Sequence, residues 1–123
     1  MPKTSVVIYQ DERGKAPLIE WLKKQSEQVQ NKSREMVALL AERGHELRRP
    51  HVENVGGGIY ELRVIVRRVQ HRILYAFVGH HMVLLTHGLT KTDIVPPIEI
   101  ERAIEFREKF VNDPKFHTYK VRV

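Results

Sequence analysis

The chain has no cysteine among its 123 residues, so it forms no disulfide bond and offers no thiolate ligand to a metal ion. This composition is typical of proteins that stay in the reducing cytoplasm. Long apolar runs are also missing, since no segment approaches the roughly 20 apolar residues that span a bilayer. The N-terminal segment MPKTSVVIYQDERGK lacks the apolar core of a secretory signal peptide. We therefore expect a cytoplasmic protein without a membrane segment.

Acidic residues are in the minority: 15 Asp and Glu stand against 21 Lys and Arg, giving a formal net charge of +6. A basic balance favours polyanions such as nucleic acid, because Lys and Arg neutralise phosphates and release counterions. The same balance also occurs in basic proteins whose solvated surface binds no nucleic acid. With 41% hydrophobic residues the chain can bury a core unaided, and we expect one domain over residues 1–123.

The middle of the chain is rich in β-type sequence. Within Ile59–Val66, one alternate set of side chains is apolar and the other carries Glu61 and Arg63, which predicts a strand with one dry face. His71–Val78 and Met82–His87 predict two further strands. The sequence therefore predicts an antiparallel meander with arginines on or beside an otherwise apolar sheet.

Helix signals flank this meander. Pro17 is suited to the first turn of one helix, and Glu27–Arg43 predicts a second helix that Gly44 ends. After the meander, Pro96-Pro97 predicts the start of a third helix whose apolar stripe reaches Phe110.

The remaining segments complete the expected order of elements. Ser5–Tyr9 predicts a short strand at the edge or in the interior of the sheet, residues 45–58 a polar connector, and residues 113–123 an edge strand or a loose tail. This order predicts an α+β fold, with two N-terminal helices and one C-terminal helix on one face of an antiparallel sheet. The expected core is Trp21, Leu40, Leu62, Val64, Ile73, Tyr75, Phe77, Leu84 and Ile104.

Three cations fall on consecutive elements of the meander: Arg63, Arg72 and Lys91. An arginine near an apolar core is costly unless it meets a carboxylate or an anion such as phosphate. Metal-independent RNA cleavage uses such cations to stabilise the charged phosphorane. Alternatively, Arg63 pairs with a carboxylate such as Glu61, and Lys91 is simply solvated. Arg67-Arg68, at a turn, is expected to form an electropositive rim for RNA.

Histidine supplies the candidate acid–base group, since it titrates near neutral pH. His87 is expected to end the last strand and is the best candidate, with Asp93 as its orienting group or as a second candidate. His71 is interpreted as a buried imidazole and His80-His81 as surface residues. No metal-ligand spacing accompanies these histidines, so we expect neither a metal nor another cofactor.

Four segments in order carry a resemblance to the RelE/HigB toxins of type II toxin–antitoxin pairs, and most closely to their phage-derived HigB-like branch. These segments are GIYELR (58–63), HRILYAF (71–77), LLTHGLTK (84–91) and PPIEIERA (96–103). The resemblance extends over about residues 6–110, and Arg63, Arg72 and Lys91 match its basic positions. It implies a ribosome-dependent mRNA endoribonuclease that inhibits translation. It also implies neutralisation by a helix-turn-helix antitoxin, through which alone the pair would contact operator DNA.

Two departures from the family pattern bear on activity. Thr92 stands at a second basic position, and Ile94-Val95-Pro96 replaces a tyrosine found in many RelE members. The alternatives are a ParE-like toxin that shares the fold but inhibits DNA gyrase, and an inactive prophage relative. We expect Arg72 to matter more to activity than to stability, with its replacement by Ala changing stability by no more than about 1 kcal/mol.

Overall fold

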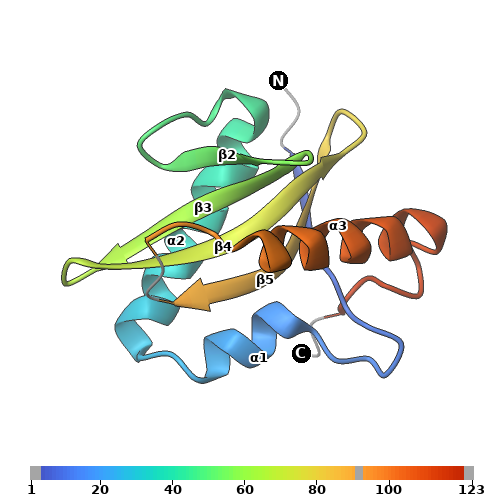
Figure 1. Cartoon of the computed structure of the whole chain (residues 1–123), viewed down its shortest axis with the longest axis horizontal. Coiled ribbons are helices and arrows are strands. Elements are labelled where there is room, and N and C mark those ends of the chain that lie inside the picture. The colour runs from blue at the N-terminus through green and yellow to red at the C-terminus, as the bar shows by residue number, and fades with distance from the viewer. Residues whose placement is uncertain (1–3, 91–92, 121–123) are drawn as a thin grey trace.

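The computed structural model of the chain describes residues 4–90 and 93–120 (Figure 1). The elements follow one another as β1 (Ser5–Ile8), α1 (Pro17–Lys23), α2 (Glu27–Arg43), a short 3₁₀ turn (Gly44–Glu46), β2 (Val52–Gly56), β3 (Ile59–Val66), β4 (Val69–Val78), β5 (Met82–Thr90) and α3 (Pro97–Asn112). Over these residues, no helix combines the length and the apolar composition needed to cross a bilayer.

One five-stranded sheet forms the centre of the molecule, with the strand order β1-β5-β4-β3-β2. Strands β2 to β5 are antiparallel neighbours, which confirms the expected meander, whereas β1 runs parallel to β5 at one edge. The sheet is therefore mixed.

The expectation of a plain polar connector over residues 45–58 is wrong, because β2 lies within it and pairs with β3. Val52 pairs opposite Leu62 and is buried, so this mostly polar segment contributes one side chain to the core. The tight return into β3 follows through Gly57 and Gly58, both at positive φ, a conformation that glycine adopts without a Cβ clash.

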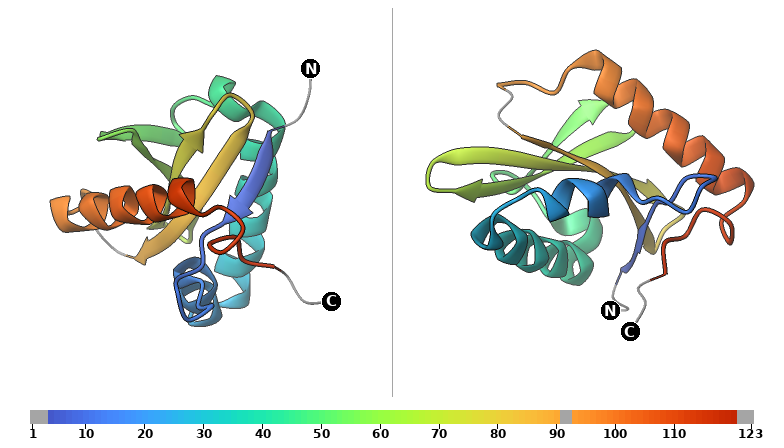
Figure 2. Two further views of the ribbon diagram at one scale, coloured as in Figure 1. Left: turned by 90° about the vertical axis from the view of Figure 1, so that its right-hand side faces the viewer. Right: turned by 90° about the horizontal axis from the view of Figure 1, so that it is seen from below.

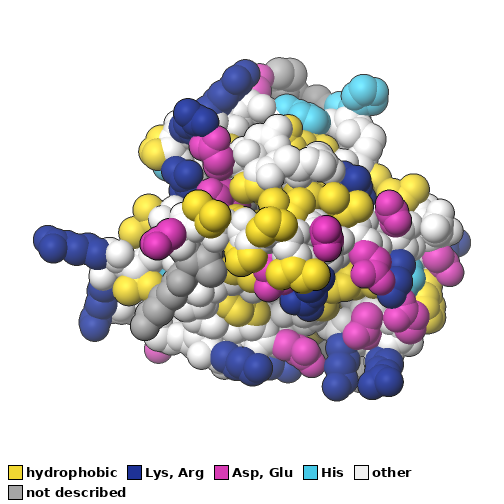
Figure 3. All heavy atoms as spheres, in the orientation of Figure 1, with side chains coloured by type: hydrophobic (Ala, Val, Ile, Leu, Met, Phe, Trp, Pro, Cys, Tyr) yellow, Lys and Arg dark blue, Asp and Glu magenta, His cyan; other side chains and the backbone are white. Residues whose placement is uncertain are grey.

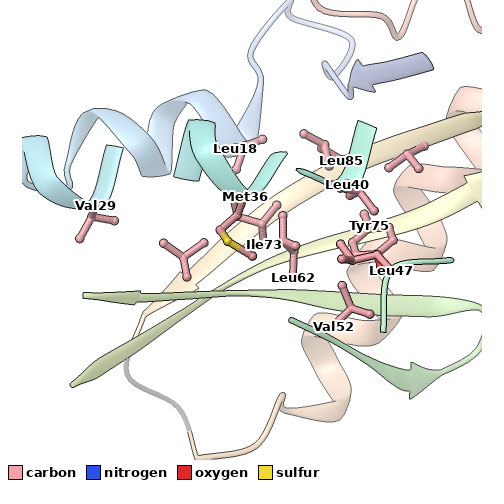
Figure 4. Close-up of a cluster of buried hydrophobic side chains, with 12 residues drawn as sticks. Leu18, Val29, Met36, Leu40, Leu47, Val52, Leu62, Ile73, Tyr75 and Leu85 are labelled. Atoms are coloured by element: carbon pink, nitrogen blue, oxygen red, sulfur yellow. The ribbon is translucent and has the colours of Figure 1, made fainter. Parts of the chain in front are cut away.

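Helices cover both faces of the sheet. Helices α1 and α2 pack on one face against an apolar cluster that includes Leu62, Ile73 and Tyr75 (Figure 4). Helix α3 lies on the opposite face (Figure 2), where Ala103 packs near Leu74. The α+β class and the three helices are confirmed, but the expectation that all helices share one face is wrong.

The composition of β4 explains this sandwich. Its residues His71 to Ala76 are buried without a break, so both alternate sets of side chains need cover. A strand that is apolar on both faces is stable only between two layers.

Helix α2 has the predicted bounds, and local hydrogen bonds explain both of its ends. The Ser26 side chain accepts a hydrogen bond from the backbone N–H of Val29 at 3.3 Å, which caps the first turn. Gly44 closes the helix at a φ of 53°, with its N–H donating to the carbonyl of Leu40. Pro97 is the first residue of α3, as predicted.

Most of the expected core is buried. Leu40, Leu62, Val64, Ile73, Tyr75 and Leu84 are almost fully inaccessible, whereas Trp21, Phe77 and Ile104 are partly buried and pack against the core clusters.

The C-terminal segment returns to the start of the chain. Tyr119 N–H donates to the carbonyl of Ile8 at 2.8 Å, and Gln10 N–H donates to the carbonyl of His117 at 2.9 Å. Tyr9 stacks between Phe106 and His117, with ring centroids 4.5 Å and 5.3 Å away. Of the two expectations for the tail, residues 117–119 therefore follow the paired one, as an isolated bridge at the sheet edge.

Candidate functional site

The two candidate arginines of the meander meet across neighbouring strands. The register of β3 and β4 sets Arg63 directly opposite Arg72, and the register of β4 and β5 sets His87 opposite Leu74. Because alternate side chains of a strand share a face, Arg72 lies on the same side as Leu74. All of these side chains are therefore on the α3 face of the sheet, at neighbouring positions.

Glu61 lies at the centre of this group. Its Oε1 accepts hydrogen bonds from both Nε and Nη2 of Arg63 at 3.3 Å, and its Oε2 contacts Nε of Arg72. Glu53 of β2 adds a second, longer ion pair with Arg63 at 3.7 Å. The alternative that Arg63 pairs with Glu61 is thus observed. The carboxylate fixes both guanidinium groups in one ion-pair network.

Burial separates the roles that the two arginines can play. The Arg72 side chain is only 4% exposed, and its Nη2 donates to the backbone carbonyl of Asp93 at 3.0 Å. The Arg63 side chain is 27% exposed and lies at the edge of the network. A polyanion can therefore reach Arg63 directly, whereas Arg72 acts through Glu61 and Arg63.

The burial of Arg72 overturns the expectation that its loss leaves stability unchanged. Removing one member of a buried ion pair leaves the other charge without compensation, at a cost of about 3–5 kcal/mol. Glu61 is 4% exposed, so water cannot replace Arg72 as its partner.

His87 is buried within β5 rather than at its end, because the strand extends to Thr90. Its Nε2 lies 3.2 Å from Oε1 of Glu99, and the same oxygen accepts a hydrogen bond from Nη1 of Arg102 at 2.8 Å. Since a carboxylate only accepts hydrogen bonds, we assign the N–H of the neutral ring to Nε2. Nδ1 then faces the hydroxyl of Thr86 at 3.2 Å.

The environment of His87 keeps its imidazole neutral. Burial, with a smaller contribution from the charge of Arg102, lowers the pKa of His87 to about 4, and Glu99 offsets only part of this shift. Near neutral pH the ring therefore carries one proton and donates it to Glu99. The Glu99 side chain is 21% exposed, so it is the member of this dyad that reaches solvent.

Arg67 and Arg68 form the two-residue turn between β3 and β4, with φ angles of 50° and 67°. Such turns favour Gly and Asn, because other residues meet steric strain at positive φ. Both side chains are exposed. In Figure 3, basic side chains project from the molecule at the end of this hairpin, as expected of an electropositive rim.

The structure thus brings Arg63, Arg72 and His87 to one face, and Asp93 joins them through its backbone carbonyl while its side chain is exposed. Lys91 lies outside the described residues. Arg67 and Arg68 lie at the far end of the hairpin that carries Arg63 and Arg72.

Sequence reasoning missed Glu61 and Glu99 as members of the site. Glu61 could have been found from its shared strand face with Arg63, two residues away, but no pattern linked Glu99 to His87. Among residues 4–90 and 93–120, no group of three or more His, Cys, Asp or Glu side chains could hold a metal ion.

Comparison with known proteins supplies the family. No curated protein matches the chain. A family model described as "Phage derived protein Gp49-like (DUF891)" matches residues 20–108, which include α2, the whole meander and most of α3. The chain therefore belongs to the phage-derived Gp49-like family, which is one of the RelE-like toxin families.

Proposed function

We propose that this protein is the toxin of a type II toxin–antitoxin pair, of the HigB-like branch, and that it cleaves mRNA on the ribosome. The observation that carries this proposal is the convergence of Arg63, Arg72 and His87 on one face of the sheet. A toxin role is compatible with membership of the Gp49-like family.

In this proposal Arg63 contacts the scissile phosphate. Its guanidinium offers the paired donors that phosphate accepts, and Glu61 and Arg72 hold it in place from below. As the phosphorane forms, its added negative charge strengthens this contact, which is how a fixed cation lowers the barrier.

The His87–Glu99 dyad is the proposed acid–base group. The 2′-hydroxyl of RNA attacks the adjacent phosphorus, the bond to the 5′-oxygen breaks, and a 2′,3′-cyclic phosphate and a 5′-hydroxyl result. Glu99 is the proposed base for the 2′-hydroxyl proton, because it reaches solvent and His87 orients it. Lys91, Arg67, Arg68 and the exposed side chain of Asp93 are left as peripheral contacts to RNA on the ribosome.

The proposed partner is a helix-turn-helix antitoxin encoded beside this chain, with operator DNA bound through that antitoxin. An mRNA endonuclease would be lethal if left free, so a neutralising protein is expected. The net charge of +6 would speed association with an acidic surface of that partner.

The decisive experiment maps mRNA 5′ ends in cells after induction of the chain. We expect new ends in phase with codons, and an Arg63→Ala variant should lose them. The second candidate is the ParE-like activity on gyrase, which the burial of Arg72 in an internal ion pair favours. Intact mRNA together with DNA-damage signalling would establish that second candidate and refute the first, and harmless expression would refute both.

A further inference from the structure

A second surface feature lies on the sheet face opposite the candidate site. A groove of about 550 Å³ runs between α1, α2 and β1. Its lining is predominantly apolar and includes Val6, Ile8, Leu18, Leu22, Val37 and Leu85. Several of these side chains are only partly buried, so the two helices leave apolar surface uncovered between them.

The groove contains a buried polar group without a partner. Ser33, on the α2 wall, is 1% exposed, and its hydroxyl forms no hydrogen bond among the described residues. A buried hydroxyl that lacks a partner costs about 1–3 kcal/mol. An occupant of the groove with a polar group at this point would remove that cost.

The charged residues that line the groove are all basic. Lys23 of α1 and Arg34 of α2 border it, and no Asp or Glu is among the described residues of its wall. Neither cation forms an ion pair with a described residue, although Arg34 Nη1 donates to the side-chain oxygen of Asn31 at 2.9 Å. The groove is therefore apolar at its base and positive at its rim.

We infer that this groove binds an acidic amphipathic helix of the neutralising partner. A helix of this kind inserts apolar side chains at intervals of three and four residues, while carboxylates beside them pair with Lys23 and Arg34. A second copy of this chain fits less well, because the positive rim would meet another basic surface. This inference rests on the proposed function only for the identity of the partner.

The position of the groove makes the inference separable from the nuclease. Because α1 and α2 cover one face of the sheet and Arg63 lies on the other, groove variants should cleave mRNA normally when the partner is absent. They should nevertheless escape neutralisation when the partner is present.

The test uses the full chain and the helix-turn-helix protein encoded by the adjacent gene. Two variants perturb the groove: Ala38→Trp fills it, and Lys23→Glu with Arg34→Glu reverses its rim. A matched control, Arg13→Glu with Lys115→Glu, makes the same charge change at exposed positions outside the groove. We expect each groove variant to raise the Kd for the partner about tenfold or more, and the control about twofold or less.

A crosslinking amino acid in place of Ala38 should map to a helix of the partner that carries Asp or Glu. Unchanged Kd values in both groove variants would overturn the inference, as would failure of the partner to bind the wild-type chain. Loss of self-association alone, or of binding to phosphatidylglycerol vesicles alone, would assign the groove to a different occupant and equally overturn it. Absence of codon-phased cuts with groove-dependent binding intact would refute the proposed nuclease and leave the groove standing.

Discussion

Replacing Arg72 by Ala tests the ion-pair network at the centre of the candidate site. The substitution deletes the partner of Glu61, which is 4% exposed and keeps only Arg63 at 3.3 Å. Breaking a buried pair costs about 3–5 kcal/mol, and the remaining contact with Arg63 places the expected loss near the lower end, at about 3 kcal/mol. For a chain of this length, that corresponds to a fall in Tm of roughly 10 °C.

The assay is urea denaturation of the wild type, Arg72→Ala, Glu61→Leu and the double variant, which together form a double-mutant cycle. The two single changes should each destabilise the protein by more than half as much again as the double change, because the double variant leaves no uncompensated charge. The deficit of Arg72→Ala should also shrink at acidic pH, since protonation discharges the unpaired carboxylate. A loss below about 1 kcal/mol in Arg72→Ala, with no coupling in the cycle, would refute the network.

Three further predictions concern the site and its support. Arg63→Ala should slow cleavage roughly 30- to 1,000-fold with a change in stability below about 1 kcal/mol, since the side chain is partly exposed; wild-type cleavage by a folded variant would exclude the residue from the site. Because the pKa of His87 is lowered to about 4 in the folded state, the unfolded state binds the proton first, so stability should fall by up to about 3 kcal/mol between pH 6.5 and pH 4. Urea titrations of His87→Asn should lack this part of the pH dependence, and identical slopes would show that the imidazole is not buried. Gly88→Ala should cost about 1–3 kcal/mol, because the new Cβ would overlap the ring of Trp21; a Tm unchanged from the wild type would show that the ring is free to move.

Local sequence patterns accounted for the elements that depend on local physics. The alternation in Ile59–Val66 gave the bounds of β3, and the serine and glycine at its ends gave those of α2. Strand β5 was underestimated, because Gly88 was interpreted as the start of a loop. In the structure this glycine is within the strand, where its missing side chain makes room for Trp21.

The errors arose where the answer depends on contacts between distant segments. Strand β2 has few apolar residues, and its place in the sheet depends on pairing with β3. The side of the sheet that α3 covers was legible in the unbroken apolar character of β4, but that signal was interpreted as one core rather than two. For the site, sequence identified Arg63 and Arg72 but not the depth of Arg72, which the cover supplied by neighbouring elements determines.

The pairing of Ile8 with Tyr119 has a consequence for the order of folding during synthesis. Strand β1 emerges first, yet its neighbours in the sheet are β5 and residues 117–119, which are made late. The helices and the β2–β5 meander can form as they emerge, whereas Tyr9 cannot be enclosed until Phe106 and His117 are available. The nascent chain therefore holds an incomplete sheet edge until almost all of it has left the ribosome.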